Sequence, residues 1–337
     1  GGARSALAEQ IHDAFHLVRD REGRVRVHAT VAREFEAEFR DEAGRWASQL
    51  DGHLELALSC QSPGTDTLAL DDQDQPAREG DGRLLLRPGG HGALLDNLAG
   101  SHADVVLVRN IDNVQSAAHR ELSRRCRRRL AGCLASLQAQ TFQLLDDLST
   151  AAANPPSNAA LETAERLSRD RFGVSAPWPR EREARRQAQL RMLDRPMRVC
   201  GMVPNSGEPG GGPFWVEEVE GTPWRQIVEG AEIATGRPEQ RVVWQSATHF
   251  NPVDMALGLR DRQDQPYELE RFRDPAAVFV TEKTHGSKRV RALEHPGLWN
   301  GSMARWLTVF VEIPAEVFSP VKTVLDLLRP EHQAGRE

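Results

Sequence analysis

Residues 84–113 read LLLRPGGHGALLDNLAGSHADVVLVRNIDN, and this stretch decides the fold. Its three leading leucines predict a strand, the glycine-rich segment 87–92 a loop, and the residues after it a helix. The apolar run 104–109 is too short for a helix and predicts a buried strand that ends in the polar cluster 110–113. Strand, loop, helix and strand in this order are typical of an α/β fold, in which ligands bind at strand ends.

The same patterns extend over the rest of the chain. Apolar residues at helical spacing predict helices over 4–20, 31–50 and 116–148. Alternating or continuous apolar runs predict strands over 25–30, 53–58, 197–203, 277–281 and 307–313. The acidic run 71–82 predicts a solvated turn or hairpin tip, and residues 318–328 a loop that runs into a helix. Proline-rich segments bracket a charged helical stretch that ends near Asp194, which predicts a boundary between two halves.

Composition bounds the class of protein. The chain has 337 residues, 39% hydrophobic and 27% charged, which is enough for a large core. A net charge of −6 gives no overall attraction to nucleic acid or to an anionic membrane, so we expect neither as a partner. There is no apolar stretch near the ~20 residues of a membrane span, and the four cysteines form no CxxC pair. We therefore expect reduced thiols and a cytoplasmic protein, and we interpret the opening residues 1–5, which lack Met, as the interior of a longer chain.

The glycine-rich loop is the first candidate site. Gly89, Gly90 and Gly92 allow backbone N–H groups to approach a phosphate or a planar base, and His91 adds an imidazole. The alternative is a tight turn in which the glycines only provide positive φ.

Asp112, which follows the predicted strand 104–109, is the second candidate. Mg²⁺ takes oxygen ligands and usually binds through one or two carboxylates together with substrate phosphates, which suits this position. The alternative is that Asp112 caps the next helix, although Asn113 or Ser116 could also do so.

Loops of the second half supply further candidates. The run 207–213 has four glycines, which suits a backbone folded closely around a ligand, and polar and aromatic neighbours are typical of a sugar site. The alternative for this run is a flexible connector. The substrate-binding candidates of these loops are Asn205, Glu208, Gly210, Gly211, Gly212, Asn251, Asp254, Trp299 and Asn300. Asp254 is also a candidate second metal ligand, although no established ligand spacing accompanies it and His249.

The basic residues are strongly skewed. Only Lys283, Lys288 and Lys322 are lysines, beside 40 arginines, so each lysine raises the question of whether an ammonium group is needed there. Five arginines cluster in the predicted helix 116–148, and we interpret them first as a solvated face and second as a phosphate patch. They are Arg124, Arg125, Arg127, Arg128 and Arg129.

Several strings also carry a resemblance. The chain resembles a bacterial family known as domain of unknown function 4301 in the strings RPGGHGALLDNL, VRNIDNV and FSPVKTVLDLLRPEHQ. The match covers nearly the whole chain from about Gln61 onward. The same strings resemble UTP:glucose-1-phosphate uridylyltransferases more distantly. Those chains carry a GHG loop, an N-x-D-N strand end and a PVKT-x-x-DLL segment in this order. The three motifs correspond here to His91, to Asn110 through Asn113, and to Lys322.

The resemblance implies an α/β fold with a GT-A-like, Rossmann-type mixed sheet flanked by helices, and with a helical insert. It implies that the GHG loop and Asn110 lie near the nucleotide, Asp112 on Mg²⁺ and Lys322 on phosphate. Gly2, in the opening GGARS, would correspond to the glycine-rich triphosphate loop. The implied halves are a nucleotide-binding half (1–150), a helical insert or linker (151–195) and a sugar- and phosphate-binding half of the same fold (196–337).

The leading functional hypothesis is a nucleotidyltransferase that joins a nucleoside triphosphate, UTP in the first place, and a sugar 1-phosphate, and releases pyrophosphate. Positioning and charge neutralisation would provide most of the rate acceleration. A second hypothesis is a nucleotide or nucleotide-sugar binding protein without turnover. A third is a phosphohydrolase that uses Asp112 and Asp254.

Overall fold

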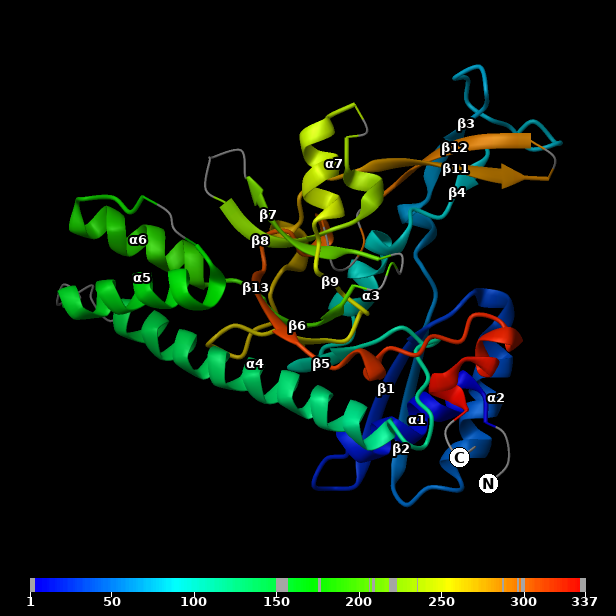
Figure 1. Cartoon of the computed structure of the whole chain (residues 1–337), viewed down its shortest axis with the longest axis horizontal. Coiled ribbons are helices and arrows are strands. Elements are labelled where there is room, and N and C mark those ends of the chain that lie inside the picture. Colours follow the sequence, from blue (N-terminus) through cyan, green and yellow to red (C-terminus); the bar gives the residue numbers. More distant parts are fainter. Residues whose placement is uncertain are drawn as a thin grey trace.

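The computed structural model describes residues 4–149, 157–174, 177–205, 207, 210–217, 223–234, 236–286, 288–295, 297 and 301–333. The chain forms a mixed α/β structure of sheets flanked by helices (Figure 1), as the sequence predicts. The helices are α1 (Ala6–Leu17), α2 (Glu36–Ala47), α3 (Leu95–Ala99), α4 (Arg120–Ser149), α5 (Asn158–Phe172), α6 (Arg182–Leu193) and α7 (Pro238–Gln245).

The strands alternate with these helices. They are β1 (Arg24–Thr30), β2 (His53–Ser59), β3 (Thr67–Leu70), β4 (Leu86–Arg87), β5 (Val105–Val108), β6 (Met197–Pro204), β7 (Gly212–Glu217), β8 (Pro223–Val228), β9 (His249–Phe250), β10 (Met255–Gly258), β11 (Phe279–His285), β12 (Lys288–Glu294) and β13 (Leu307–Glu312).

The central sheet has the strand order β13-β6-β10-β5, and β9 pairs with the end of β6. Strand β6 pairs in parallel with β13, whereas β10 runs antiparallel to both β6 and β5. Seven consecutive residues of β6, 197–203, are buried, because one face packs against α4 and α5 and the other belongs to the core cluster that includes α3. On β10, Ala256 belongs to the core cluster that includes α4 and α5, while Met255 and Leu257 belong to the cluster that includes α3.

Two smaller sheets complete the frame. The parallel pair β1 and β2 packs against α1 and α2 around a core of Leu7, Ile11, Phe15, Val25 and Ala43. The antiparallel sheet β11-β12-β3-β4 projects from the body at the upper right of Figure 1. This projecting sheet, here called the arm, joins strands from both ends of the chain, since β3 and β4 precede α4 and β11 and β12 follow it.

Several predicted elements differ from the structure. Strand β5 lies at one end of its sheet and pairs, within the described residues, only with β10, so its side chains are half-buried or exposed rather than buried. The predicted helix 31–50 starts later, at Glu36, and the predicted C-terminal helix is a short 3-10 turn, Val324–Leu328. None of the described helices is long and apolar enough to cross a bilayer.

Candidate functional site

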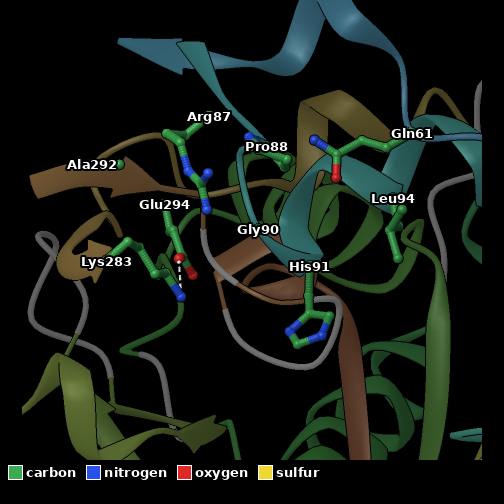
Figure 2. A pocket seen from close by; sticks show the side chains of 9 residues that line it. All are labelled: Gln61, Arg87, Pro88, Gly90, His91, Leu94, Lys283, Ala292 and Glu294. Atoms are coloured by element: carbon green, nitrogen blue, oxygen red, sulfur yellow. Dashed lines mark ion pairs between the residues drawn. The ribbon is translucent and has the colours of Figure 1, made fainter. Parts of the chain in front are cut away.

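A pocket of about 320 Å³ lies between the glycine loop and the arm. Figure 2 shows its lining side chains, which come from Gln61, from the loop with its flanking residues, and from β11 and β12. The lining residues are Gln61, Arg87, Pro88, Gly90, His91, Leu94, Lys283, Ala292 and Glu294. Residues more than 180 positions apart in the sequence therefore form one cavity beside the predicted nucleotide loop.

The loop glycines have different reasons for being glycine. A Cβ on Gly89 would collide with the carbonyl oxygen of Thr65 and lie 2.9 Å from the ring of His295, so packing alone requires a glycine there. Gly90 has φ +79° and borders the pocket, where a Cβ would lie 3.1 Å from the Glu294 carboxylate. The turn interpretation thus explains Gly89, whereas Gly90 has both a positive φ and a place in the cavity wall.

The arm forms a charged wall of the pocket, with Lys283 on β11, Glu294 on β12 and Arg87 at the end of β4. The ammonium of Lys283 lies 3.0 Å from Oε1 of Glu294, and the hydroxyl of Thr281 donates a hydrogen bond of 2.8 Å to the same oxygen. Burial raises the pKa of Glu294, but the hydrogen bonds from Lys283 and Thr281 outweigh it, and the pKa is lowered. Nε of Arg87 is buried and has no hydrogen-bond partner in the described part of the chain. Two cations and one anion leave this wall with a net positive charge, which suits an anionic ligand.

Sequence reasoning singled out Lys322 and did not place Lys283 in a site. The scarcity of lysine was the available signal, since it applies equally to Lys283. The sequence does not show how β11 pairs with β12. In the structure Lys283 pairs with Val290, and the Lys283 side chain lies on the pocket face of the arm.

A second cluster joins the predicted strand end to the C-terminal segment. The backbone N–H of Val321 donates to the carbonyl of Asp112 at 2.8 Å, and an isolated bridge pairs Asn113 with Pro320. The structure thereby brings Asp112 and Lys322 onto adjacent backbone segments. Helix α4 begins only at Arg120, so Asp112 does not cap it, and the capping alternative is wrong.

The other residues of this cluster have structural contacts. Asn113 is fully buried, and its side-chain amide donates to the carbonyl of Val317 at 3.3 Å and accepts from the N–H of Ser319 at 3.0 Å. Asn110, a predicted nucleotide-binding residue, is exposed, and its carbonyl accepts from the N–H of Asn113. The strand end is therefore held rigidly against the C-terminal segment.

Asp254, the predicted second metal ligand, faces a guanidinium. It is 2% exposed, precedes β10 where Arg109 follows β5, and its Oδ1 lies 3.8 Å from Nε of Arg109. Desolvation lowers the pKa of Arg109 to about 10, against the opposing effect of Asp254 and Asp13. No group of three or more metal-binding side chains is found among the described residues. The assignment of Mg²⁺ to Asp112 therefore stays a prediction, and Asp254 is buried against Arg109.

The loop candidates of the second half have mostly intramolecular contacts. Asn251 is 4% exposed, and its amide donates to the carbonyl of Gly201 at 2.7 Å and accepts from the N–H of Val253 at 3.1 Å. The side chain of Asn205 accepts from the N–H of Gly207 at 2.9 Å. The carbonyl of Gly211 accepts from the N–H of Asn251 at 2.8 Å.

Packing also explains two glycines of this segment. A Cβ on Gly210 would lie 3.2 Å from the ring of Phe250, and one on Gly212 would lie 2.8 Å from the ring of Phe214. Neither residue lines the pocket beside the glycine loop. Four candidate site residues, Gly2, Glu208, Trp299 and Asn300, lie outside the described residues.

The arginine cluster of α4 corrects the sequence interpretation. Arg124 and Arg127 are buried, at 8% and 6% exposure, and both bind the carboxylate of Asp13 on α1, at 2.9 Å and 2.6 Å. The solvated-face interpretation is wrong for these two residues. Helical spacing alone could not show that α1 places an acidic side chain opposite them.

Comparisons with known proteins agree with this fold. The model of the family described as Domain of unknown function (DUF4301) matches residues 1–333. None of the curated proteins matches the chain. A point mutant of UDP-glucose pyrophosphorylase from Leishmania major, solved in complex with UDP-glucose, is similar over 97% of this chain and 59% of its own, with 15% identity and a TM-score of 0.52.

A UDP-glucose phosphorylase from Trypanosoma brucei is similar over 96% of this chain and 56% of its own, with 14% identity and a TM-score of 0.46. At such identities, the similarity to the Leishmania protein shows a shared fold and nothing finer. The chain spans about three fifths of the length of that protein.

Proposed function

This chain belongs to the family described as Domain of unknown function (DUF4301), and from that premise we propose that it is a nucleotidyltransferase that joins UTP and a sugar 1-phosphate. The observation that carries the proposal is the pocket in which Gly90 and His91 face the cationic side chains of Arg87 and Lys283. A glycine loop accommodates a planar base or a phosphate without steric conflict, and the charged wall attracts negative charge. The fold shared with the UDP-glucose pyrophosphorylase of Leishmania major supports the same class of reaction.

The reaction requires little covalent chemistry from the protein. An oxygen of the sugar phosphate attacks the α-phosphorus of UTP, a new O–P bond forms, and the bond to the β-phosphate oxygen breaks, so that pyrophosphate leaves with its electron pair. The chain's contribution is to hold both reactants in line and to neutralise charge, through the loop N–H groups, Lys283 and Lys322. We assign Asp112 to a Mg²⁺ ion, which when bound supplies charge neutralisation at the phosphates.

The arrangement around Asp254 favours this proposal over a phosphohydrolase. A hydrolase that uses both Asp112 and Asp254 needs two available carboxylates, whereas Asp254 is buried against Arg109. The other alternative, a binding protein without turnover, shares the same pocket and differs only in the outcome of the assay.

The test combines turnover with binding. We expect pyrophosphate release from UTP with glucose 1-phosphate or N-acetylglucosamine 1-phosphate, and calorimetric binding of UTP and of the UDP-sugars. Lys283→Ala should weaken binding roughly tenfold, since one charge-assisted contact is worth about 1.4 kcal/mol or more. Lys288→Ala is the matched control, because Lys288 lies on the same arm and does not line the pocket.

The possible outcomes separate the hypotheses. Binding of UTP without pyrophosphate release would identify a binding protein, and release of orthophosphate would identify a hydrolase. If neither UTP nor a UDP-sugar binds the wild-type chain, or if Lys283→Ala and Lys288→Ala behave alike, the proposed pocket is not the nucleotide site.

A further inference from the structure

The arm has two chemically different faces. The inner face carries Lys283, Glu294 and Arg87 and forms the charged wall of the pocket. The opposite face, here called the outer face, carries Val280, Leu293, Leu68 and Leu86, and the exposed side chains of Val278 and Leu84 lie just before β11 and β4.

Strand register places the outer-face residues side by side. Val280 pairs with Leu293 across β11 and β12, and Leu68 pairs with Leu86 across β3 and β4. Ala292 pairs with Ala69 across β12 and β3, so the next residues in this antiparallel register, Leu293 and Leu68, are also neighbours. Residues paired in this way share a face, and one apolar row therefore crosses all four strands.

The outer face is open within the described structure. The exposed fractions are 63% for Val280, 53% for Leu86, 46% for Leu84, 43% for Val278, 38% for Leu68 and 36% for Leu293. An antiparallel sheet that has one face in water normally carries polar residues there. These six side chains together expose on the order of 500 Å², which is near the upper end for the largest apolar patch of a monomer.

Charges of both signs lie beside the apolar row. On the outer face, Glu282 pairs directly with Arg291, and Arg291 also forms an ion pair with Asp74 in the turn after β3. Further positive charge comes from Arg289 toward the tip of the arm and from Arg78, which is bridged to Leu84. A rim with both signs can meet a copy of itself, because a two-fold axis can place acidic side chains of one copy opposite basic side chains of the other. A nucleic acid would instead require a net positive surface.

We infer that the outer face is a dimer interface, on which two copies of this chain pack sheet against sheet. Facing sheets of this kind interdigitate apolar side chains about 10 Å apart. A standard stable interface buries ~800 Å² per partner, and the ~500 Å² of exposed apolar side chains would supply more than half of it. The inference does not depend on the proposed function, although the interface would lie directly behind the pocket wall.

The interface places a mechanical constraint on the pocket. The inner face that carries Lys283 and Glu294 belongs to the same four strands as the outer face. Within the described structure the arm projects from the body (Figure 1), so a second copy would brace it from behind. Dimerisation would thus fix the position of the pocket wall relative to the glycine loop.

Sedimentation equilibrium over sub-micromolar to high-micromolar concentrations tests the inference on the full chain. We expect a dimer for the wild type and at least a hundredfold weaker association for the double variant Val280→Glu/Leu86→Glu. Leu325→Glu/Leu328→Glu is the matched control, since these leucines are 69% and 70% exposed on the C-terminal 3-10 turn, away from the arm strands, and should leave the dimer intact.

A milder pair, Val280→Thr/Leu86→Thr, keeps strand propensity and covers the case in which the charged variant does not fold. A wild type that is monomeric throughout, or a dimer that survives both arm variants, overturns the inference. Co-sedimentation with phosphatidylcholine–phosphatidylserine vesicles is measured in parallel. Strong binding of the wild type that is lost in the arm variants also overturns the inference, because the outer face would then contact lipid.

Discussion

Lys283 and Glu294 form an ion pair of 3.0 Å across two neighbouring strands, on the face of the arm that looks toward the glycine loop. The side chain of Glu294 is 16% exposed and that of Lys283 is 44% exposed, so the carboxylate is the more deeply held partner. In the proposed site, a ligand phosphate would contact the same ammonium group of Lys283 that the Glu294 carboxylate already contacts. Glu294 therefore orients Lys283 and competes with the ligand for it.

Because Glu294 competes with the ligand for Lys283, we expect the Glu294→Gln variant to bind UTP roughly three- to tenfold more tightly at neutral pH. Removing the carboxylate leaves the positive charge of Lys283 and Arg87 available to phosphate. Because the pair is partly exposed, its loss should cost less than about 1 kcal/mol of stability. Titration calorimetry with UTP provides the measurement, and the double variant Lys283→Ala/Glu294→Gln provides the control. If Glu294→Gln tightens binding equally in the Lys283→Ala background, Glu294 does not act through Lys283.

Asp13 is expected to be a major stability determinant. Its carboxylate lies 2.9 Å from Arg124, 2.6 Å from Arg127 and 3.6 Å from Arg109, and all these side chains are nearly buried. Asp13→Asn would leave three guanidinium groups without this counter-charge, and we expect a loss of about 3 kcal/mol or more. Urea unfolding gives the value. Glu36→Gln is the control, because its ion pair with Arg40 on α2 is solvent-exposed and should contribute little.

The pH dependence of that effect follows from the pKa of Asp13. Burial raises this pKa, but the ion pairs with Arg127, Arg109 and Arg124 lower it below its ordinary value of 3.8. A carboxyl whose pKa is lowered on folding stabilises the protein fully above its unfolded pKa, and this contribution is lost as the pH falls through the folded value. The difference in unfolding free energy between wild type and Asp13→Asn should thus be constant near neutral pH and shrink below about pH 3.8. A difference that stays constant down to pH 2 would contradict this assignment.

Motif order identified part of the candidate site, because these motifs are short and local, and the roles assigned to their residues stay predictions. The loop glycines, the strand end at Asp112 and the segment around Lys322 are recognisable from short strings, and the structure does bring Asp112 and Lys322 onto adjacent backbones. Helix and strand positions followed from apolar periodicity, which is a local property.

The remaining features depend on contacts between distant segments. Lys283 reaches the pocket because of a strand register, and Arg124 and Arg127 are buried because α1 supplies Asp13. Asn251 looked like a ligand-binding residue, yet its amide holds the backbone of Gly201 and Val253. No spacing rule within one segment reports such pairings, since each depends on which other segment lies opposite.

The two candidate metal ligands, Asp112 and Asp254, should respond differently to substitution by asparagine. Asp112→Asn removes the charge that a divalent cation needs, so Mg²⁺-dependent nucleotide binding should weaken while the melting temperature hardly changes, because the backbone carbonyl of Asp112 makes the contact to Val321. Asp254→Asn should instead destabilise the fold by a few kcal/mol, because Arg109 stays buried and loses a partner. Calorimetric titration of UTP with and without Mg²⁺, beside thermal unfolding, distinguishes the two. A large stability loss in Asp112→Asn together with an intact Mg²⁺ response would make Asp112 a structural residue.

Lys322 gives the sharpest test of the transferase proposal. Its side chain is exposed at the start of the C-terminal 3-10 turn, where its backbone N–H is bonded to Asp326, so the turn is held by the backbone and not by the ammonium. A solvated cation in this chain would ordinarily be arginine, whereas a compact ammonium with rotatable donors suits a phosphate contact.

We therefore expect Lys322→Arg to lower the rate of pyrophosphate release roughly a hundredfold although charge is conserved, since one contact to developing phosphate charge is worth about 3 kcal/mol. Lys322→Ala should lose as much activity with an unchanged melting temperature, because the side chain is exposed. Lys288→Arg is the control, since this lysine is exposed on the arm and should tolerate the exchange. Full activity in Lys322→Arg would remove Lys322 from the phosphate site, and the charge neutralisation assigned to it in the proposed reaction would have to come from another residue.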